Sequence, residues 1–229
     1  MQRPEGMQKL ALAALVATSA LVIIAGAVWG IRLFAMSRNQ SATQSTNPAN
    51  YPLSGFPMEG NLAPDFTLSD QFGHQVTLSS FHGHEVVLAF IDSQCKTLCP
   101  LTSTIMYNAK ARLATSASSQ VQLIAVNANP NATSIAAVQA WSINHGMLHQ
   151  WEFLTGSAQQ LQSLYSKYNV YAQVNSNGVL EHDPIIFIID SQGHERLYFE
   201  TLDSNSQSDL QSQEIGLEAG MKQWLPQSH

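Results

Sequence analysis

The sequence predicts an α/β domain with a mixed central sheet, preceded by a transmembrane helix. Short apolar runs rich in β-branched residues alternate with segments of helical periodicity, which is typical of a partly parallel sheet flanked by helices. The last two of these runs are joined only by residues 190–193, a connection too short for anything but an antiparallel hairpin. A long apolar stretch near the N-terminus supplies the transmembrane segment.

That apolar stretch covers residues 10–34 and contains one charged residue, Arg32. It exceeds the roughly 20 residues needed to cross a bilayer, and also the core of about 7–15 residues of a cleaved signal peptide. We therefore predict a transmembrane anchor at 10–34 with residues 1–9 in the cytoplasm, and a cleaved signal peptide is the alternative. Basic residues flank the stretch on both sides almost equally, so the positive-inside rule hardly decides the orientation.

A polar segment separates the anchor from the folded part. Residues 35–57 are rich in Ser, Thr, Asn, Gln and Pro and predict a flexible tether, which leaves 58–229 as the folded domain. From position 51 onward there are six Lys and Arg against fifteen Asp and Glu, a formal charge of −9. This balance argues against a nucleic-acid partner. It suits a cationic or metal-bearing partner, although a solvated acidic surface is the commoner explanation.

The first half of the domain predicts a hairpin, two strands and a helix. Residues 61–78 alternate in polarity on both sides of a turn, the pattern of a β-hairpin. Residues 85–92 (EVVLAFID) and 121–126 (VQLIAV) are β-rich apolar runs and predict buried strands. Between them, apolar residues recur at helical spacing through 100–117. Pro100 stands where the first turn of a helix tolerates proline.

The middle of the domain predicts two helices around a short strand. Residues 133–145 have helical character, with Thr133 or Ser134 as the N-cap. Residues 151–154 predict a short strand. Residues 157–168 follow as a helix with its large apolar residues on one face.

The end of the domain predicts a hairpin and a final helix. Residues 184–189 (PIIFII) predict a third buried strand, 195–200 an edge strand, and 209–224 a closing helix. A β-α-β unit followed by a hairpin and a helix is the layout of a thioredoxin-like domain.

The two cysteines of the chain, Cys95 and Cys99, lie between the first buried strand and the first helix. The start of a helix offers unpaired N–H groups and partial positive charge, which favour a thiolate, and Lys96 adds to this. We expect Cys95 to be the more exposed. Such a pair can form a reversible disulfide, bind a soft metal such as Cu(I) or Zn(II), or act as a structural staple. A staple across so short a loop would restrain little chain entropy.

Two thiolates leave a metal site incomplete, so a third ligand is needed. Of the eight histidines, His182 stands directly before the buried strand at 184–189, in the segment EHDPIIFIID. Three others lie in turns around glycines, and four have no evident partner in the sequence: His74, His82 and His84, then His145, His149, His194 and His229. His182 is therefore the candidate.

Residues 60–200 resemble the Sco/SenC family of copper-binding, thioredoxin-fold proteins that assist cytochrome c oxidase assembly. The resemblance is carried by APDFTLSDQFGHQVTLSSFHGHEVVLAF, CKTLCP, VNANPNATS, WEFLTG and the His182 segment. It implies that Cys95, Cys99 and His182 bind one copper ion, Cu(I) or Cu(II), per chain. It also implies a partner, either the copper-site subunit of an oxidase or another copper or thiol protein. The domain would then lie outside the cytoplasm, at a bacterial plasma membrane.

The sequence departs from the family pattern at three places. Lys96 replaces the usual proline of the cysteine motif, and VNANPN carries asparagines where an acidic residue is common. Pro184 stands where thioredoxins have a cis-proline that faces the cysteines, a feature that Sco proteins commonly lack.

These departures leave other functions open beside copper delivery. In a thiol–disulfide oxidoreductase, Cys95 would attack a partner disulfide and Cys99 would resolve the mixed species. His182 or Lys96 would then adjust the thiolate fraction. In a peroxiredoxin-like peroxidase, Cys95 would become a sulfenic acid and Cys99 would recycle it.

Overall fold

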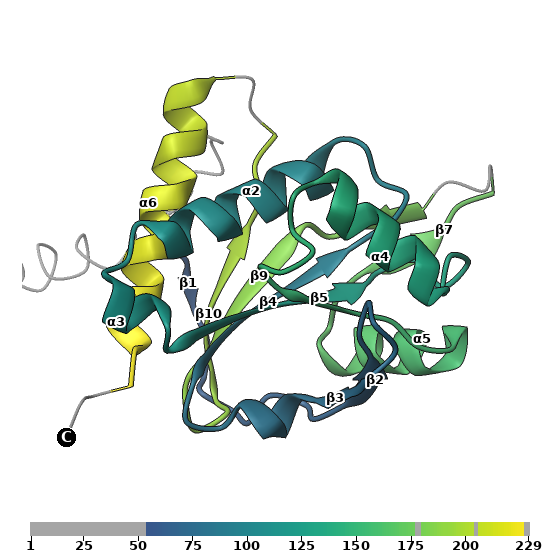
Figure 1. The fold of residues 1–229 in the computed structure, drawn as a ribbon, viewed down its shortest axis with the longest axis horizontal. Helices are drawn as coiled ribbons and strands as arrows, with labels where there is room; N and C mark the ends of the chain where they lie inside the picture. Colours follow the sequence, from purple (N-terminus) through teal and green to yellow (C-terminus); the bar gives the residue numbers. More distant parts are fainter. Residues whose placement is uncertain (1–53, 177–179, 204–205, 227–229) are drawn as a thin grey trace, which may run out of the picture. The chain divides into compact units, whose positions relative to one another are not determined.

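The computed structural model describes residues 54–176, 180–203 and 206–226 (Figure 1). The predicted cytoplasmic segment, the transmembrane anchor at 10–34 and nearly all of the predicted tether lie outside these ranges. Within the described ranges, none of the helices is both long enough and apolar enough to cross a membrane.

A mixed six-stranded sheet forms the centre of the domain, with the strand order β1-β10-β9-β4-β5-β6. β4, β5 and β6 run parallel to one another, whereas β9 is antiparallel to both β4 and β10. The prediction of a mixed sheet is therefore confirmed. The strands are β1 (Phe56–Pro57), β4 (Glu85–Ile91), β5 (Val121–Asn127), β6 (Glu152–Leu154), β9 (Ile185–Ile189) and β10 (Glu195–Glu200).

Helices cover both faces of the sheet (Figure 1). α2, α4 and α6 lie on one face, and α5 lies on the other beside the β2–β3 hairpin. This arrangement is the thioredoxin-like layout predicted from the sequence. The elements outside the central sheet are β2 (Thr67–Ser69), β3 (Gln75–Thr77), the 3-10 helix η2 (Leu78–Phe81), α2 (Leu98–Ala111), α3 (Thr115–Ser118), α4 (Ile135–Asn144), α5 (Ala158–Lys167) and α6 (Gln207–Trp224).

The apolar run of β4 is continuous because both faces of this central strand are covered. Its residues alternate between the two core clusters, and all of them are buried. The side that faces α2 and α6 carries Val87, Ala89 and Ile91, and the side that faces α5 carries Val86, Leu88 and Phe90. Packing on both faces therefore fixes the position of the end of β4, directly before the cysteine loop.

Most predicted helices appear with small shifts in their ends. Ser134 caps α4, and Ser157 caps α5 through a reciprocal capping box with Gln160. The helix predicted over 100–117 begins earlier, at Leu98, and ends at Ala111, after which α3 forms a separate short turn of helix.

The strand predicted at the sheet edge is not at the edge. β10 is covered by β1, where Phe56 pairs with Tyr198 and the two rings stack with centroids 4.8 Å apart. Phe56 and Pro57 are the last residues of the predicted tether, so the folded part begins before residue 58. A strand of two residues carries too little alternation to be read from sequence.

A second hairpin was not predicted. β7 (Ala172–Val174) and β8 (Leu180–His182) pair antiparallel in a separate two-stranded sheet. None of its residues is fully buried, so no buried face creates a pattern in the sequence. This hairpin matters because it carries His182.

Candidate metal centre

The cysteine pair lies at the start of α2. Cys99 is the second residue of the helix and is 1% exposed, whereas Cys95 lies in the preceding loop and is half-buried. The backbone N–H of Cys95 donates to Asp92 O at 3.1 Å. The N–H of Cys99, unpaired within the helix because it belongs to the first turn, points at Cys95 Sγ at 3.4 Å. As predicted, Cys95 is the more exposed thiol and the helix start favours its thiolate.

His182 reaches the same place from a distant part of the chain. It is the last residue of β8, and its Nε2 lies 3.4 Å from Cys99 Sγ. Its Nδ1 lies 3.2 Å from the backbone oxygen of Asp183. For metal binding, the proton would sit on Nδ1 and be donated to this carbonyl, which leaves the Nε2 lone pair free for the ion.

The three side chains form a set that fits a soft metal ion. The sulfurs of Cys95 and Cys99 and a ring nitrogen of His182 all lie within 4.8 Å of one another. A three-coordinate site with bonds of about 2.0–2.3 Å separates its ligand atoms by roughly 3.5–4 Å, so a small rotation of side chains closes the set. Two thiolates and one imidazole favour Cu(I) or Zn(II) over hard cations.

The two thiols differ in acidity. A hydrogen bond from the Cys99 thiol lowers the pKa of Cys95 to about 3, assisted by hydrogen bonds from His182 and from the backbone N–H groups of Cys99 and Thr97, while burial opposes the shift. The same contact with Cys95, together with burial, raises the pKa of Cys99 above its usual range. Cys95 is thus the thiolate, and Cys99 holds the shared proton.

A buried polar network supports the cysteine loop. Asn129, only 4% exposed, donates through Nδ2 to Asp92 Oδ1 at 2.9 Å and to Gln94 Oε1 at 3.4 Å. The N–H of Gln94 donates to the same Asp92 oxygen at 2.8 Å. These contacts fix the residues directly before Cys95. From the sequence, these asparagines stood out only as a departure from the family pattern. Their role was not readable there, because the contact between the segment after β5 and the cysteine loop is not local.

Thr201 ties the histidine segment to α2. Its N–H donates to Pro184 O at 2.8 Å, and its hydroxyl shares a buried 2.8 Å hydrogen bond with the hydroxyl of Thr102 in α2. Through Thr201, the segment that follows His182 is therefore connected to the cysteine helix.

Pro184 is not the cis-proline that thioredoxins have at this position. The described part of the chain contains no cis peptide bond, so the bond between Asp183 and Pro184 is trans. Trans is also the isomer that an X-Pro bond intrinsically prefers.

The other histidines in the described ranges are not part of this centre. Two that the sequence left without partners have aromatic neighbours. His145 stacks on Trp141 with centroids 3.9 Å apart, and His149 stacks on Phe72 at 6.0 Å. His229 lies outside the described residues.

The chain resembles known proteins along most of its folded part. The sequence profile of the SCO1/SenC family matches residues 57–213, which is more than half of the chain and includes all three candidate ligands. No curated protein gives a significant match.

Three solved structures share the fold. The apo Sco1 protein from Thermus thermophilus is 21% identical with a TM-score of 0.63, covering 77% of this chain and 99% of its own. The Arabidopsis thaliana ScoI with copper bound is 18% identical with a TM-score of 0.60, covering 72% and 100%. BsSco, described as a member of the Sco family of cytochrome c oxidase assembly proteins with a disulfide switch, is 20% identical with a TM-score of 0.55, covering 72% and 96%.

Proposed function

The chain belongs to the SCO1/SenC family, and from this premise we propose that it is a membrane-anchored copper-binding protein that delivers copper to cytochrome c oxidase during assembly. One observation carries the proposal. His182, 83 positions after Cys99 in the sequence, lies 3.4 Å from its sulfur, beside the second thiol of the pair. A solved relative holds copper, and another is described as an oxidase assembly protein, which supports the same role here.

The residues have separate tasks in this role. Cys95 offers a ready thiolate, and Cys99 loses its proton as the copper ion enters, because a thiol binds a metal only in its deprotonated form. His182 supplies the third donor through Nε2. Three donors leave the ion open on one side, and neither Cys95 nor His182 is fully buried. A ligand of the partner can enter there and displace one sulfur at a time.

The N-terminal part places the domain near its partner. In the proposal, the helix at 10–34 anchors the chain in a bacterial plasma membrane, and the tether between residue 35 and the start of β1 holds the domain outside the cytoplasm. A flexible tether of this length has an end-to-end distance of roughly 25 Å, which raises the effective concentration of the domain at a membrane-bound oxidase.

A thiol–disulfide oxidoreductase is the second candidate, and the lowered pKa of Cys95 favours it. Cys95 would attack a disulfide of the partner, and Cys99 would then attack Cys95 to release the reduced partner, leaving a Cys95–Cys99 disulfide. Its target could be the cysteines of an oxidase copper site, so the two roles can coexist.

A Cu(I) titration of the full-length protein against a chromogenic chelator tests the first candidate. We expect one tightly bound copper ion per chain. The affinity should fall in His182→Ala and Cys95→Ser by at least the roughly 10–100-fold that follows loss of a ligand's supporting contact. His74→Ala, at a 77% exposed side chain away from the centre, is the matched control and should bind normally.

The two candidates give opposite results for His182. Unchanged Cu(I) affinity in His182→Ala, together with efficient disulfide reduction by the wild type, would refute copper delivery and support the oxidoreductase.

A further inference from the structure

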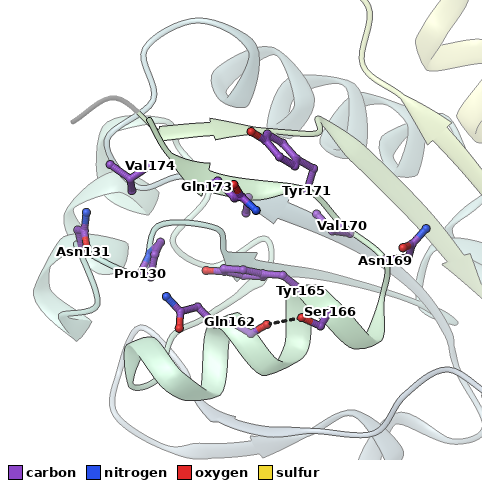
Figure 2. Close-up of a pocket in the computed structure, with 11 residues that line it drawn as sticks. Pro130, Asn131, Gln162, Tyr165, Ser166, Asn169, Val170, Tyr171, Gln173 and Val174 are labelled. Carbon is purple, nitrogen blue, oxygen red and sulfur yellow. Dashed lines mark hydrogen bonds between the residues drawn. The ribbon is translucent and has the colours of Figure 1, made fainter. Parts of the chain in front are cut away.

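A neutral groove lies beside β7 (Figure 2). It has a volume of about 720 Å³ and lies between α5, the loop at Pro130–Asn131 and the segment 169–174 that contains β7. None of its eleven lining residues is charged, although the domain is strongly acidic. A small ionic ligand is therefore not what this groove is built to bind.

One wall of the groove is a strand edge. The N–H of Asp183 donates to Tyr171 O, so this pair is hydrogen-bonded across the hairpin. In an antiparallel ladder, hydrogen-bonded and non-hydrogen-bonded pairs alternate. The pairs of Ala172 with His182 and of Val174 with Leu180 are therefore non-hydrogen-bonded.

The consequence is an open edge on β7. The N–H and C=O groups of Ala172 and Val174 point away from β8, and among the described residues β7 pairs with no strand besides β8. An edge of this kind presents donors and acceptors at the spacing of another extended chain.

The side chains of the groove fit the same kind of ligand. Amides lie on its different walls, Gln173 on β7, Gln162 on α5 and Asn131 on the loop (Figure 2). A side-chain amide donates and accepts, so it can bind either polar group of a peptide bond. Tyr171 and Val174 add exposed apolar surface at 45% and 37% exposure.

Residues of both walls are linked to the metal centre. Ala172 lies directly across the hairpin from His182. On the other wall, Pro130 follows Asn129, whose side chain binds Asp92 and Gln94 beside Cys95. A chain bound in the groove therefore lies beside residues that neighbour His182 and the cysteine loop.

We propose that this groove binds an extended, uncharged segment of the copper-receiving partner, which adds as a strand to the free edge of β7. The inference rests on the proposed function and names the docking site for it. β7 has three residues and spans roughly 10 Å, so the bound segment contributes about three to five residues. Backbone pairing supplies affinity, and the neutral walls disfavour charged segments.

The test uses the full-length, copper-loaded protein in detergent and the soluble copper-site domain of the oxidase from the same organism. Val174→Pro removes an outward N–H and places the proline ring in the path of an incoming strand. Proline is tolerated at such an edge position because the hairpin does not use that N–H. Val174→Ala is the matched control, since it shortens the side chain and keeps the N–H.

We expect the Kd for the oxidase domain to rise at least about fivefold in Val174→Pro, as for loss of one or two hydrogen bonds, and to change less than about twofold in Val174→Ala. The double variant Asn131→Ala/Gln162→Ala, on the opposite walls, should raise the Kd by about two- to tenfold. All three variants should keep the wild-type Cu(I) affinity, which reports that the hairpin still presents His182.

Failure of the inference differs from failure of the proposed function. Wild-type binding and copper transfer in Val174→Pro would overturn the docking role of the groove and leave the proposed copper delivery intact. A wild-type protein that neither binds nor metallates the oxidase domain would overturn both. A Val174→Pro variant that changes only self-association in sedimentation experiments would assign the edge to a second copy and overturn the inference.

Discussion

Glu85 offers the sharpest test of the physical reasoning. It is the first residue of β4, it is 0% exposed, and neither carboxyl oxygen has a hydrogen-bond partner among the described residues. Burial, with a smaller contribution from the negative charge of Asp190, raises the pKa of Glu85 to about 9. We expect Glu85→Gln, which keeps the shape and removes the ionisable group, to stabilise the domain at neutral pH.

The size and sign of the effect of Glu85 on the free energy of unfolding follow from proton linkage. Because the folded-state pKa is raised, the folded domain keeps the proton while the unfolded chain, with an ordinary pKa of 4.5, releases it as the pH rises. The contribution of Glu85 to stability is therefore complete below about pH 4.5 and is lost progressively toward pH 9. Each pH unit in this window costs about 1.4 kcal/mol, so the loss at pH 7 is about 3 kcal/mol.

Urea unfolding of residues 51–229 at pH 5, 6, 7 and 8 measures this effect. The difference in unfolding free energy between Glu85→Gln and wild type should grow by about 1.4 kcal/mol per pH unit. Glu59→Gln, at an exposed position, is the control and should show no such slope. A difference that stays constant from pH 5 to pH 8 would refute the assignment of Glu85 as a buried, protonated acid.

Two further predictions concern the centre itself. Asn129→Ala removes the hydrogen bonds to Asp92 and Gln94. Cu(I) affinity should therefore fall by roughly 10–100-fold, and the free energy of unfolding by about 1–3 kcal/mol. Unchanged affinity in a chelator competition would exclude a positioning role for Asn129. Because its pKa is lowered, Cys95 should react with iodoacetamide at a nearly constant rate from pH 5 to pH 8, well before Cys99. Peptide mapping that finds Cys99 modified first, or a tenfold rate change per pH unit at Cys95, would contradict this order.

The membrane anchor at 10–34 remains a sequence prediction, because it lies outside the described residues. The position of the cysteine pair, in contrast, was readable locally. A buried strand, a short loop and a helix each have their own pattern within residues 85–117, and together they place the pair between the strand and the helix. Only the structure shows that α2 begins at Leu98, so that Cys99 lies in its first turn.

Short strands with little burial could not be predicted from local patterns. β1 has two residues, and β7 and β8 have three each with little burial, so no periodic apolar face marks them in the sequence. The cover that β1 gives to β10 and the hairpin that carries His182 depend on pairing with distant segments. The groove beside β7 follows from the same pairing.

The sequence by itself determined which residues can do the chemistry, because two thiols and one histidine before a buried strand are matters of residue type and local pattern. Tertiary structure decided how they meet. It brought His182 to 3.4 Å from Cys99 and placed Asn129 behind the cysteine loop. The physical reason is that local patterns record which face of a segment is buried, whereas distances between distant segments are set only when the strands pair and the helices pack.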